Sequence, residues 1–393
     1  MGGGPAAQAP RMIGPAAGRS RTAPPAGRPV TESDPPMHSD PPARRPRLLL
    51  YGMYDPSKQA SAPVVRIARL AAALGQTCDL QVITGDRVGR ARGAARWLLR
   101  RAWRDVDAVY VEAASSAPMP QDLLLMTLVR LSGRPLGIYF RDAYQLFRDL
   151  YPAPGGRGFL NDLLWRLTLP LVRHLATHRF TPSAGLARAL GMTDAVLLAP
   201  GTDPDLPDLG AGAGHRVAYV GAFGAADGLP LLIEAMATVR ATVPDAELLL
   251  VGPAPPAGLA GEAPPWVEFR RAGRAELPAL LAGARLCVIP RPITAYADLA
   301  VPIKLMDYLS YGKPIVATAA RETRSILEPA GAGLLAADSP TALAEAIVRV
   351  LLDADLAADL AAAARRLAVA PGSTWQARAA TIVATLLPDR PRP

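Results

Sequence analysis

The sequence predicts an α/β protein with two Rossmann-like domains, each a doubly wound parallel sheet, facing each other across a cleft. Short apolar runs alternate with helical stretches from residue 47 onward, a pattern typical of parallel sheets with helices on both faces. Six such runs precede a segment rich in Gly, Pro and Asp at 201–215, and six follow it. Ligands of such sheets lie beyond the carboxyl ends of the strands, so two facing halves suit chemistry between two substrates.

The twelve runs divide the chain into a first domain at 47–200, a linker at 201–215 and a second domain at 216–371. A helix follows at 372–388. The Pro-, Ala- and Arg-rich residues 1–46 cannot bury enough apolar surface to fold, so they are predicted to be a disordered tail, and 389–393 a frayed end. The predicted strands are 47–52, 79–84, 108–112, 135–140, 178–183, 195–200, 216–223, 246–252, 266–272, 285–290, 314–318 and 333–337.

Composition excludes several functions. The formal charge is +9, but the first 47 residues hold seven arginines against three acidic residues. Because no aromatic residues interleave with basic ones, nucleic-acid binding is not expected. No run approaches the ~20 apolar residues of a membrane span, and no secretory h-region begins the chain. We therefore expect a cytoplasmic protein, either free or peripheral at the inner face of a membrane. Cys78 and Cys287 are expected to be buried thiols, and no Cys/His cluster has metal-ligand spacing.

The stretch "VPIKLMDYLSYGKPIVAT" at 301–318 predicts a helix over 303–311 that leads into a buried strand. Pro302 suits the helix start, while Gly312 and Pro314 mark its end. Leu305, Met306 and Leu309 form an apolar face. The opposite face holds Lys304, Asp307, Tyr308 and Tyr311, at helical spacing.

That second face is either a solvated surface or a ligand site. The start of a helix binds anions, and Arg291 and Lys304 would add positive charge for a phosphate. Asp307, one turn in, would accept hydrogen bonds from a diol such as a ribose. Together these features describe a nucleotide site.

Two other loops follow strands on the cleft side. The turn at 219–230 has Gly221, Gly224 and Gly228, which do not match the dinucleotide-binding spacing. Gly221 lets a phosphate approach the backbone, or simply makes an ordinary turn. Arg141 and Asp142 follow another strand. As a pair they either orient a sugar hydroxyl and steady a phosphate or form a structural ion pair.

Two longer segments of the first domain also have features that point to a function. The polar loop at 51–63, with small Ser61 and Ala62, is long for such a turn and indicates a substrate loop. The segment at 156–180 is apolar with arginines spaced through it. It either lies on an anionic membrane surface or, as we favour, forms a helix pair packed on the first domain.

The residues also carry a family resemblance. The stretch at 301–318, followed by "GAGLLAADSPTALAEAIVRVLLDADL" and "TWQARAATI", resembles the C-terminal half of retaining GT-B glycosyltransferases of family 4 (glycosyltransferase group 1). "YVGAFGAADGLPLLIEAM" is similar to the opening of that half, and "LLAPGTD" to the chain just before it. "RDAYQLF" and "FTPS" resemble the N-terminal half of a subset. The resemblance spans about residues 47 to 388 and is most specific over 285–340.

The resemblance implies a nucleotide-sugar donor held by the second domain, an acceptor held by the first, and catalysis without a metal or other cofactor. Asp307 stands where the family has a ribose-binding glutamate, and Asp298 lies one residue from a sugar-binding glutamate whose position Leu299 occupies. The residues implied for donor binding are Asp307, Ile303, Leu305, Pro302, Gly221 and Ala222. Those implied for catalysis are Arg291, Lys304, Asp298, Asp142 and Arg141.

The chain also departs from the family. The turn after the first strand of the second domain, "GAFGAADG", lacks the usual Arg and Lys, and Arg141-Asp142 replaces a His-Asp pair. Arg291 and Lys304 would then take the charge of the departing diphosphate. We therefore expect a retaining transferase acting on a glycan, lipid-linked or small-molecule hydroxyl. The alternatives are a catalytically idle scaffold or partner subunit, and a nucleotide-sugar epimerase of the same fold.

Overall fold

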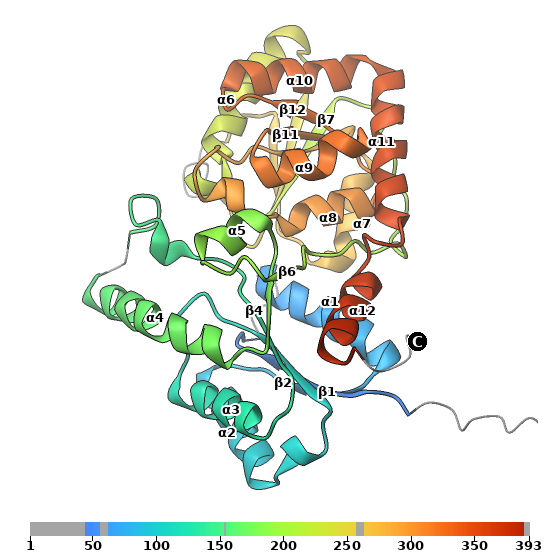
Figure 1. Ribbon diagram of the computed structural model, residues 1–393. Coiled ribbons are helices and arrows are strands. Elements are labelled where there is room, and N and C mark those ends of the chain that lie inside the picture. Colours follow the sequence, from blue (N-terminus) through green and yellow to red (C-terminus); the bar gives the residue numbers. More distant parts are fainter. Residues whose placement is uncertain (1–43, 56–61, 153–154, 257–262, 389–393) are drawn as a thin grey trace, which may run out of the picture. The chain divides into compact units, whose positions relative to one another are not determined.

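The computed structural model describes residues 44–55, 62–152, 155–256 and 263–388, which belong to one compact unit at 44–393. The predicted tails at 1–46 and 389–393 lie outside the described residues, except for 44–46, which form neither helix nor strand. Ser61 also lies outside them. The two-sheet α/β fold that the sequence predicts is confirmed (Figure 1).

The first sheet has the strand order β2-β1-β3-β4-β5-β6, and every neighbouring pair is parallel. Each strand lies within one predicted run, because strands buried on both faces read as continuous apolar stretches. The strands are β1 (Arg47–Gly52), β2 (Asp79–Ile83), β3 (Ala108–Glu112), β4 (Leu136–Tyr139), β5 (His178–Thr181) and β6 (Val196–Leu197).

The second sheet repeats this plan with the order β12-β11-β10-β7-β8-β9, again parallel throughout. In both sheets the order reverses at an inner strand, which is the switch point where ligands of doubly wound sheets bind. The strands are β7 (Arg216–Val220), β8 (Glu247–Val251), β9 (Val267–Arg270), β10 (Leu286–Ile289), β11 (Ile315–Thr318) and β12 (Leu334–Ala336).

Helices cover both faces of the first sheet because its side chains alternate. Leu49 and Tyr51 pack with α2, α3 and α4, whereas Leu48 and Leu50 pack with α1 and α12. The layer that holds α2, α3 and α4 is visible in Figure 1. The helices of this half are α1 (Ala62–Thr77), α2 (Arg87–Leu99), α3 (Pro120–Leu131), α4 (Gly155–Leu175), α5 (Ala184–Ala189) and, from the end of the chain, α12 (Trp375–Leu386).

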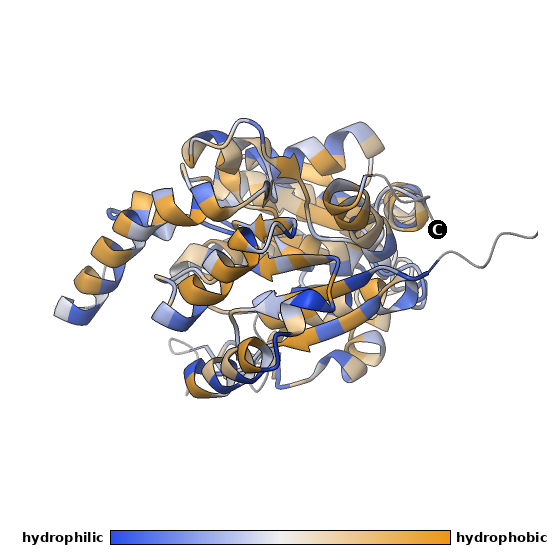
Figure 2. Ribbon diagram, turned by 60° about the horizontal axis from the view of Figure 1, so that its bottom comes forward, coloured by the Kyte–Doolittle hydropathy of each residue, from blue (hydrophilic) through white to orange (hydrophobic). Residues whose placement is uncertain are grey.

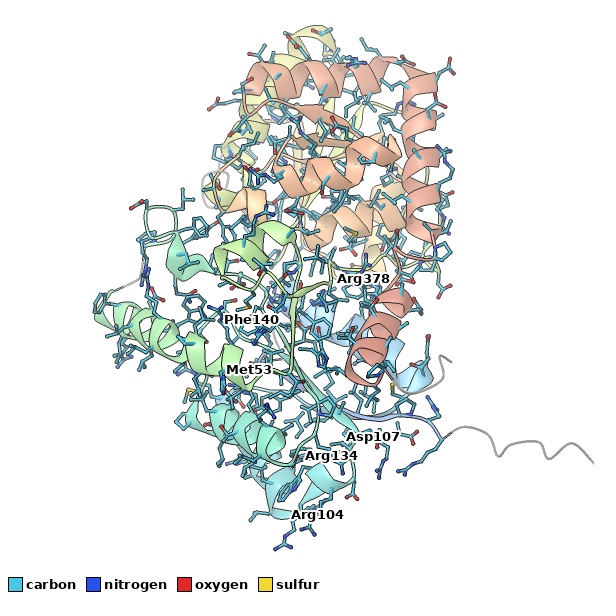
Figure 3. The ribbon with its side chains drawn as sticks, viewed as in Figure 1. Met53, Arg104, Asp107, Arg134, Phe140 and Arg378 are labelled. Atoms are coloured by element: carbon cyan, nitrogen blue, oxygen red, sulfur yellow. The ribbon has the colours of Figure 1, made fainter. Side chains whose placement is uncertain are left out.

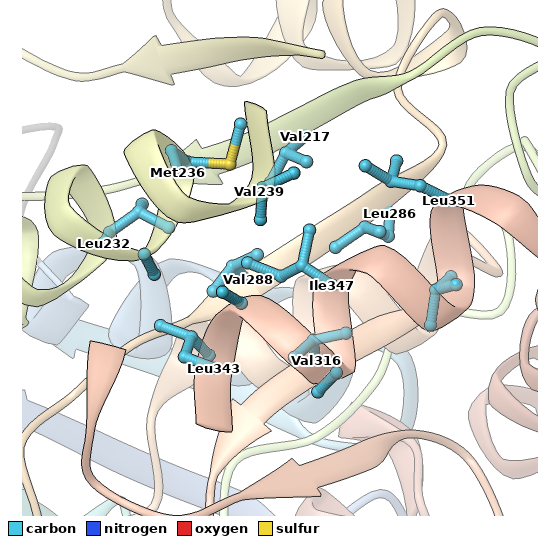
Figure 4. Packing of buried hydrophobic residues seen from close by; sticks show 14 of the residues in the cluster. Val217, Leu232, Met236, Val239, Leu286, Val288, Val316, Leu343, Ile347 and Leu351 are labelled. Atoms are coloured by element: carbon cyan, nitrogen blue, oxygen red, sulfur yellow. The ribbon is translucent and has the colours of Figure 1, made fainter. Parts of the chain in front are cut away.

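The second sheet is covered in the same way. Val217 and Val288 face α6 and α10, in the packing that Figure 4 shows, and Leu249 and Ile289 face α7, α8, α9 and α11. The helices are α6 (Leu229–Thr242), α7 (Leu277–Ala282), α8 (Ile303–Ser310), α9 (Arg321–Ala330), α10 (Pro340–Leu352) and α11 (Ala354–Val369).

The helix predicted at 303–311 is α8, and it ends one residue earlier than expected. Pro302 is its N-cap rather than its first helical residue, and Gly312 follows the helix with a φ of 61°, as a helix stop requires. The predicted polar face is only half correct. Tyr308 and Tyr311 are buried, and the hydroxyl of Tyr308 accepts a hydrogen bond from the amide of Val220 at 2.8 Å.

The segment predicted as a helix pair at 156–180 is instead one helix, α4, with Pro170 inside it, followed by β5. Trp165, Val172 and Leu175 form its buried face. Among the described residues, no helix is long and apolar enough to cross a membrane. Cys78 and Cys287 are both buried, as expected.

The last helix, α12, returns to the first half of the chain. Trp375, Ile382 and Leu386 pack in the same core cluster as Leu70 of α1 and Phe180 of β5. Just before the chain returns, the hydroxyl of Thr202 in the linker donates a hydrogen bond to the carbonyl of Ala368 in α11, at 2.6 Å.

Candidate functional site

A cleft of about 1040 Å³ lies between the two halves, lined by residues that follow the carboxyl ends of strands in both sheets. Ala62, from the loop predicted to contact substrate, is one of them. The structure brings nine of the eleven predicted site residues to this cleft, which are Arg141, Asp142, Gly221, Ala222, Arg291, Pro302, Ile303, Lys304 and Asp307.

The other two predicted residues do not line the cleft. Leu305 is fully buried in the core beneath α8, because it lies on the apolar face of that helix, so its side chain does not reach the cleft. Asp298, in the turn η6 (Ala297–Leu299), accepts a hydrogen bond from the amide of Arg321 at 2.7 Å. Its carboxylate caps the start of α9 rather than facing the cleft.

Lys304 fills the turn that lacks a cation of its own. Its ammonium nitrogen donates to the hydroxyl of Tyr219 at 2.5 Å and lies 4.1 Å from the centre of that ring. A β-carbon at Gly221 would come within 2.8 Å of the same nitrogen, so the glycine makes room for the lysine. Burial lowers the pKa of Lys304 to about 8, with Asp227 opposing and Arg291 adding to this shift.

Arg291 approaches the cleft from the loop after β10. Its guanidinium lies 5.4 Å from the ring centre of Tyr296. In the described part of the chain, no carboxylate lies within ion-pair distance of Arg291 or of Lys304. Gly228 lets the turn that holds Gly221 pack on this loop, since a β-carbon there would come within 1.8 Å of the carbonyl oxygen of Pro290. The two cations therefore face the cleft unneutralised.

Asp307 carries a partner that the sequence does not reveal. Arg274, which follows β9, donates to both of its carboxylate oxygens, at 2.6 and 3.1 Å. Both side chains line the cleft and are partly exposed. A carboxylate has about four acceptor positions, so Asp307 keeps positions for further donors.

Arg141 and Asp142 follow β4 but do not pair with each other. Arg141 lies 3.5 Å from Glu112, and its guanidinium stacks 4.7 Å from the ring centre of Tyr54. Asp142 accepts from the hydroxyl of Ser115 at 2.7 Å, while its other oxygen is buried without a hydrogen-bond partner. Burial raises the pKa of Asp142, although Arg141 and Ser115 oppose the shift. Of the two alternatives for Arg141 and Asp142, the structural ion pair between them is therefore not formed.

Glu112, at the end of β3, organises the charges on this side. It is fully buried and accepts from the guanidinium of Arg66 at 3.0 Å and from the hydroxyl of Tyr110 at 3.1 Å. Arg66, which is 1% exposed and lines the cleft, stacks 3.7 Å from the ring centre of Tyr139. Its two terminal nitrogens have no hydrogen-bond partner. One carboxylate thus serves two arginines.

Sequence reasoning missed Arg66, Glu112 and Arg274. Arg66 and Glu112 are 46 residues apart, and Arg274 is 33 residues from Asp307, so no local pattern joins them. One signal was present. A glutamate closes the otherwise apolar run "AVYVE", and a charge at the end of a buried strand needs a partner. Among the described residues there is no group of three His, Cys, Asp or Glu side chains that could hold a metal ion.

Comparison with known families bears on the second half of the cleft. Residues 214–353 match the family model described as glycosyl transferases group 1. We refer to this matched segment as the group 1 domain. It contributes Lys304, Arg291, Asp307 and Arg274 to the cleft. A search of curated proteins finds no match to the chain.

Solved structures resemble the whole chain. The sucrose-phosphate synthase of Thermosynechococcus elongatus has a TM-score of 0.65 at 16% identity, over 87% of this chain and 98% of that one. HepE of Anabaena, in complex with UDP and glucose, has a TM-score of 0.60 at 18% identity, over 88% and 100%. WaaG, a glycosyltransferase of lipopolysaccharide biosynthesis, has a TM-score of 0.61 at 16% identity, over 86% and 99%. The fold is GT-B, with the group 1 domain as its second half.

Proposed function

We propose that the chain transfers a sugar, with retention, from a nucleoside-diphosphate-sugar to a hydroxyl acceptor. The observation that carries the proposal is the pair of unneutralised cations, Lys304 and Arg291, beside the start of α8 in the group 1 domain. Anabaena HepE was solved with UDP and glucose, which supports a nucleotide-sugar as the donor.

The diphosphate of the donor would lie at the start of α8. The free amides there attract an anion, and Lys304 and Arg291 add two full charges. Negative charge grows on the departing diphosphate as the sugar bond breaks, so these cations would stabilise the transition state more than the bound substrate. The anomeric carbon would take on oxocarbenium character as the acceptor hydroxyl approaches.

Asp307 and Arg274 would hold the nucleoside. Asp307 would accept hydrogen bonds from the ribose hydroxyls through the acceptor positions that Arg274 leaves open. Arg274 would fix the carboxylate in place, because a bidentate pair with a guanidinium has a defined geometry.

The first half would hold the acceptor. Asp142 lines the cleft there with one carboxylate oxygen unused, which fits hydrogen bonding to a sugar or acceptor hydroxyl. Arg141 and Arg66 add positive charge on the same side.

Thermal unfolding with a panel of nucleoside diphosphates and nucleotide-sugars tests the donor site. At a ligand concentration of ~100 times Kd, binding should add about 2.7 kcal/mol to the free energy of unfolding. One nucleotide should stabilise the wild type and fail to stabilise Asp307→Ala. The control is Asp359→Ala, an exposed acidic residue on α11. If no compound stabilises the wild type, the donor site is wrong.

Product analysis separates the transferase from its alternatives. A transferase releases nucleoside diphosphate from the nucleotide-sugar and does so faster with the right acceptor. An epimerase would change the sugar without an acceptor, and an idle scaffold would leave the donor intact. Lys304 extends from α8 to the turn at Gly221, where it supplies the positive charge that the turn itself lacks. This position favours an active transferase over an idle scaffold.

A further inference from the structure

The outer face of α4 is apolar, although that side of a helix normally faces water. Six large hydrophobic residues on this one helix are exposed, with Phe159 at 64% and Leu167 at 66%. They recur at helical spacing between residues 159 and 171, where apolar residues run along α4, the helix that projects at the left of Figure 2. The six are Phe159, Leu160, Leu163, Leu164, Leu167 and Leu171.

Arginines border this apolar face. Arg166 and Arg173 are seven residues apart and so lie along one edge, while Arg157, which is exposed, lies near the other. Arg166 donates to the carbonyl of Gln145, and Arg173 to the carbonyl of Gly191. Both arginines are thereby held at the border of the face rather than across it. An apolar strip edged by arginines is the pattern of a helix that lies in a lipid interface.

A second element of the same layer adds positive charge. Residues 86–105, which include α2 and the turn η1 (Ala102–Arg104), hold six exposed arginines against two exposed aspartates. The exposed arginines are Arg87, Arg92, Arg96, Arg100, Arg101 and Arg104, the last of which is labelled in Figure 3. Leu99, within this run, is 83% exposed. Attraction of this kind is worth about 1 kcal/mol per basic residue near an anionic bilayer.

We propose that the outer face of α4 docks on an anionic lipid bilayer, with the arginines of α4 and of 86–105 contacting lipid headgroups. This inference stands independently of the proposed transferase activity. The helix lies on the bilayer rather than crossing it, since Arg157, Asp162, Arg166 and Arg173 interrupt it and no described helix qualifies as a span.

Two other occupants fit less well. From Phe159 to Leu171 the face is only about 18 Å long and covers a few hundred Å², well below the ~800 Å² per partner of a stable dimer. The first 43 residues hold four arginines against three acidic residues, so they offer no excess negative charge to the bordering arginines. A bilayer supplies both an apolar interior and anionic headgroups.

The docking face lies close to the acceptor side of the cleft. A small cavity behind α4 is lined by Trp165 and Leu169 of that helix and by Arg141 and Asp142, which also line the cleft. Met53 and Phe140, labelled in Figure 3, line it too. A molecule anchored in the bilayer would thus have its polar end near the cleft.

Vesicle flotation of the full chain tests the proposal. We expect binding to vesicles with about one-third phosphatidylglycerol, weaker binding at high salt, and little binding to phosphatidylcholine alone. Leu163→Gln with Leu167→Gln should lower the partition coefficient at least about tenfold, because two leucines no longer enter the lipid. The control is Leu352→Gln with Val369→Gln, two exposed aliphatic residues on α10 and α11 of the second half, which should leave it unchanged.

A second variant checks that this helix enters the bilayer. Tryptophan fluorescence of Phe159→Trp should be quenched by brominated lipids in anionic vesicles, beyond the quenching of the wild type. The proposal is overturned if the wild type does not float with anionic vesicles or if the leucine pair and its control bind alike. It is also overturned if the leucine variant only abolishes a dimer seen by gel filtration, since a second copy would then be the occupant. Unchanged thermal unfolding shows that the variants fold.

Discussion

The ammonium nitrogen of Lys304 rests against Tyr219, 2.5 Å from its hydroxyl and 4.1 Å from the centre of its ring. These partners are neutral, so they hold the lysine in position without cancelling its charge. Gly221 gives the space, since any larger residue would meet the ammonium. The charge is thereby kept at the point where the proposed diphosphate would lie.

The affinity for a nucleoside diphosphate should fall as pH rises through about 8. Burial lowers the pKa of Lys304 to about 8, so the cation is lost there instead of near its usual 10.5. One charge-assisted hydrogen bond is worth about 1.5–3 kcal/mol, which predicts at least about a tenfold loss. Isothermal titration calorimetry from about pH 6.5 to about pH 9.5 measures it.

Two variants of Lys304 make the assignment specific. Lys304→Met should bind weakly at every pH and show no change near pH 8. Lys304→Arg keeps its charge and should bind with a flat profile over the same range. A wild-type profile that is flat, or a loss that persists in Lys304→Arg, would rule out this lysine as the titrating group.

Asp307 and Arg274 should behave as one unit toward nucleotide. Arg274 donates to both oxygens of Asp307, so removing either partner disturbs the other. We expect Asp307→Ala to weaken binding by about 1–3 kcal/mol, Arg274→Gln by less, and the double variant by no more than Asp307→Ala. Calorimetric Kd values of the four proteins form the cycle. Strictly additive losses would mean that the two residues bind separately.

Glu112→Gln should destabilise the protein strongly. Its carboxylate is fully buried and contacts both Arg66 and Arg141, so the neutral amide leaves the buried Arg66 without its ion-pair partner and removes one from the partly exposed Arg141. Breaking such a pair costs about 3–5 kcal/mol of unfolding free energy. Urea unfolding measures this, with Tyr110→Phe as control, which loses one hydrogen bond to Glu112 worth about 1 kcal/mol. Equal losses in the two variants would contradict the account.

Asp142→Asn should raise stability and lower turnover. Burial raises the pKa of Asp142, so the folded state favours the proton and the charged form costs stability as pH rises past that raised pKa. The free energy of unfolding at pH 7 should therefore increase in the variant, while turnover falls at least about tenfold and nucleotide affinity stays unchanged. A variant that loses nucleotide affinity would place Asp142 in the donor site instead.

The strands could be predicted because each is a local run. "RLLLYG" and "IVAT" are mostly apolar and are buried from Leu48 and from Ile315 onward, as expected of strands covered on both faces, and both lie within predicted bounds. The end of α8 could also be predicted to within one residue, because Gly312 marks the helix stop. The sequence pattern could not decide whether Tyr308 and Tyr311 are buried or exposed. A tyrosine is compatible with water or with the core, and here α8 is wedged deeply enough to bury both.

The candidate site was predictable in outline because residues after parallel strands gather at one edge. Arg141, Arg291 and Lys304 reach the cleft for this reason. The residues that pair with these and other site residues could not be predicted from the sequence. Glu112 and Arg274 depend on the fold to bring distant segments together, and the side chain of Asp298 turned toward Arg321 instead of the cleft.

The return of α12 to the first half has a consequence for biosynthesis. Trp375, Ile382 and Leu386 complete the core beside α1, yet they are translated only after every strand of the second sheet. The first half therefore cannot close one face of its sheet while it is being translated, even though its strands emerge first. The second half, contiguous from β7 (Arg216–Val220) to α11 (Ala354–Val369), needs no such wait. The half made first is thus the half that finishes folding last.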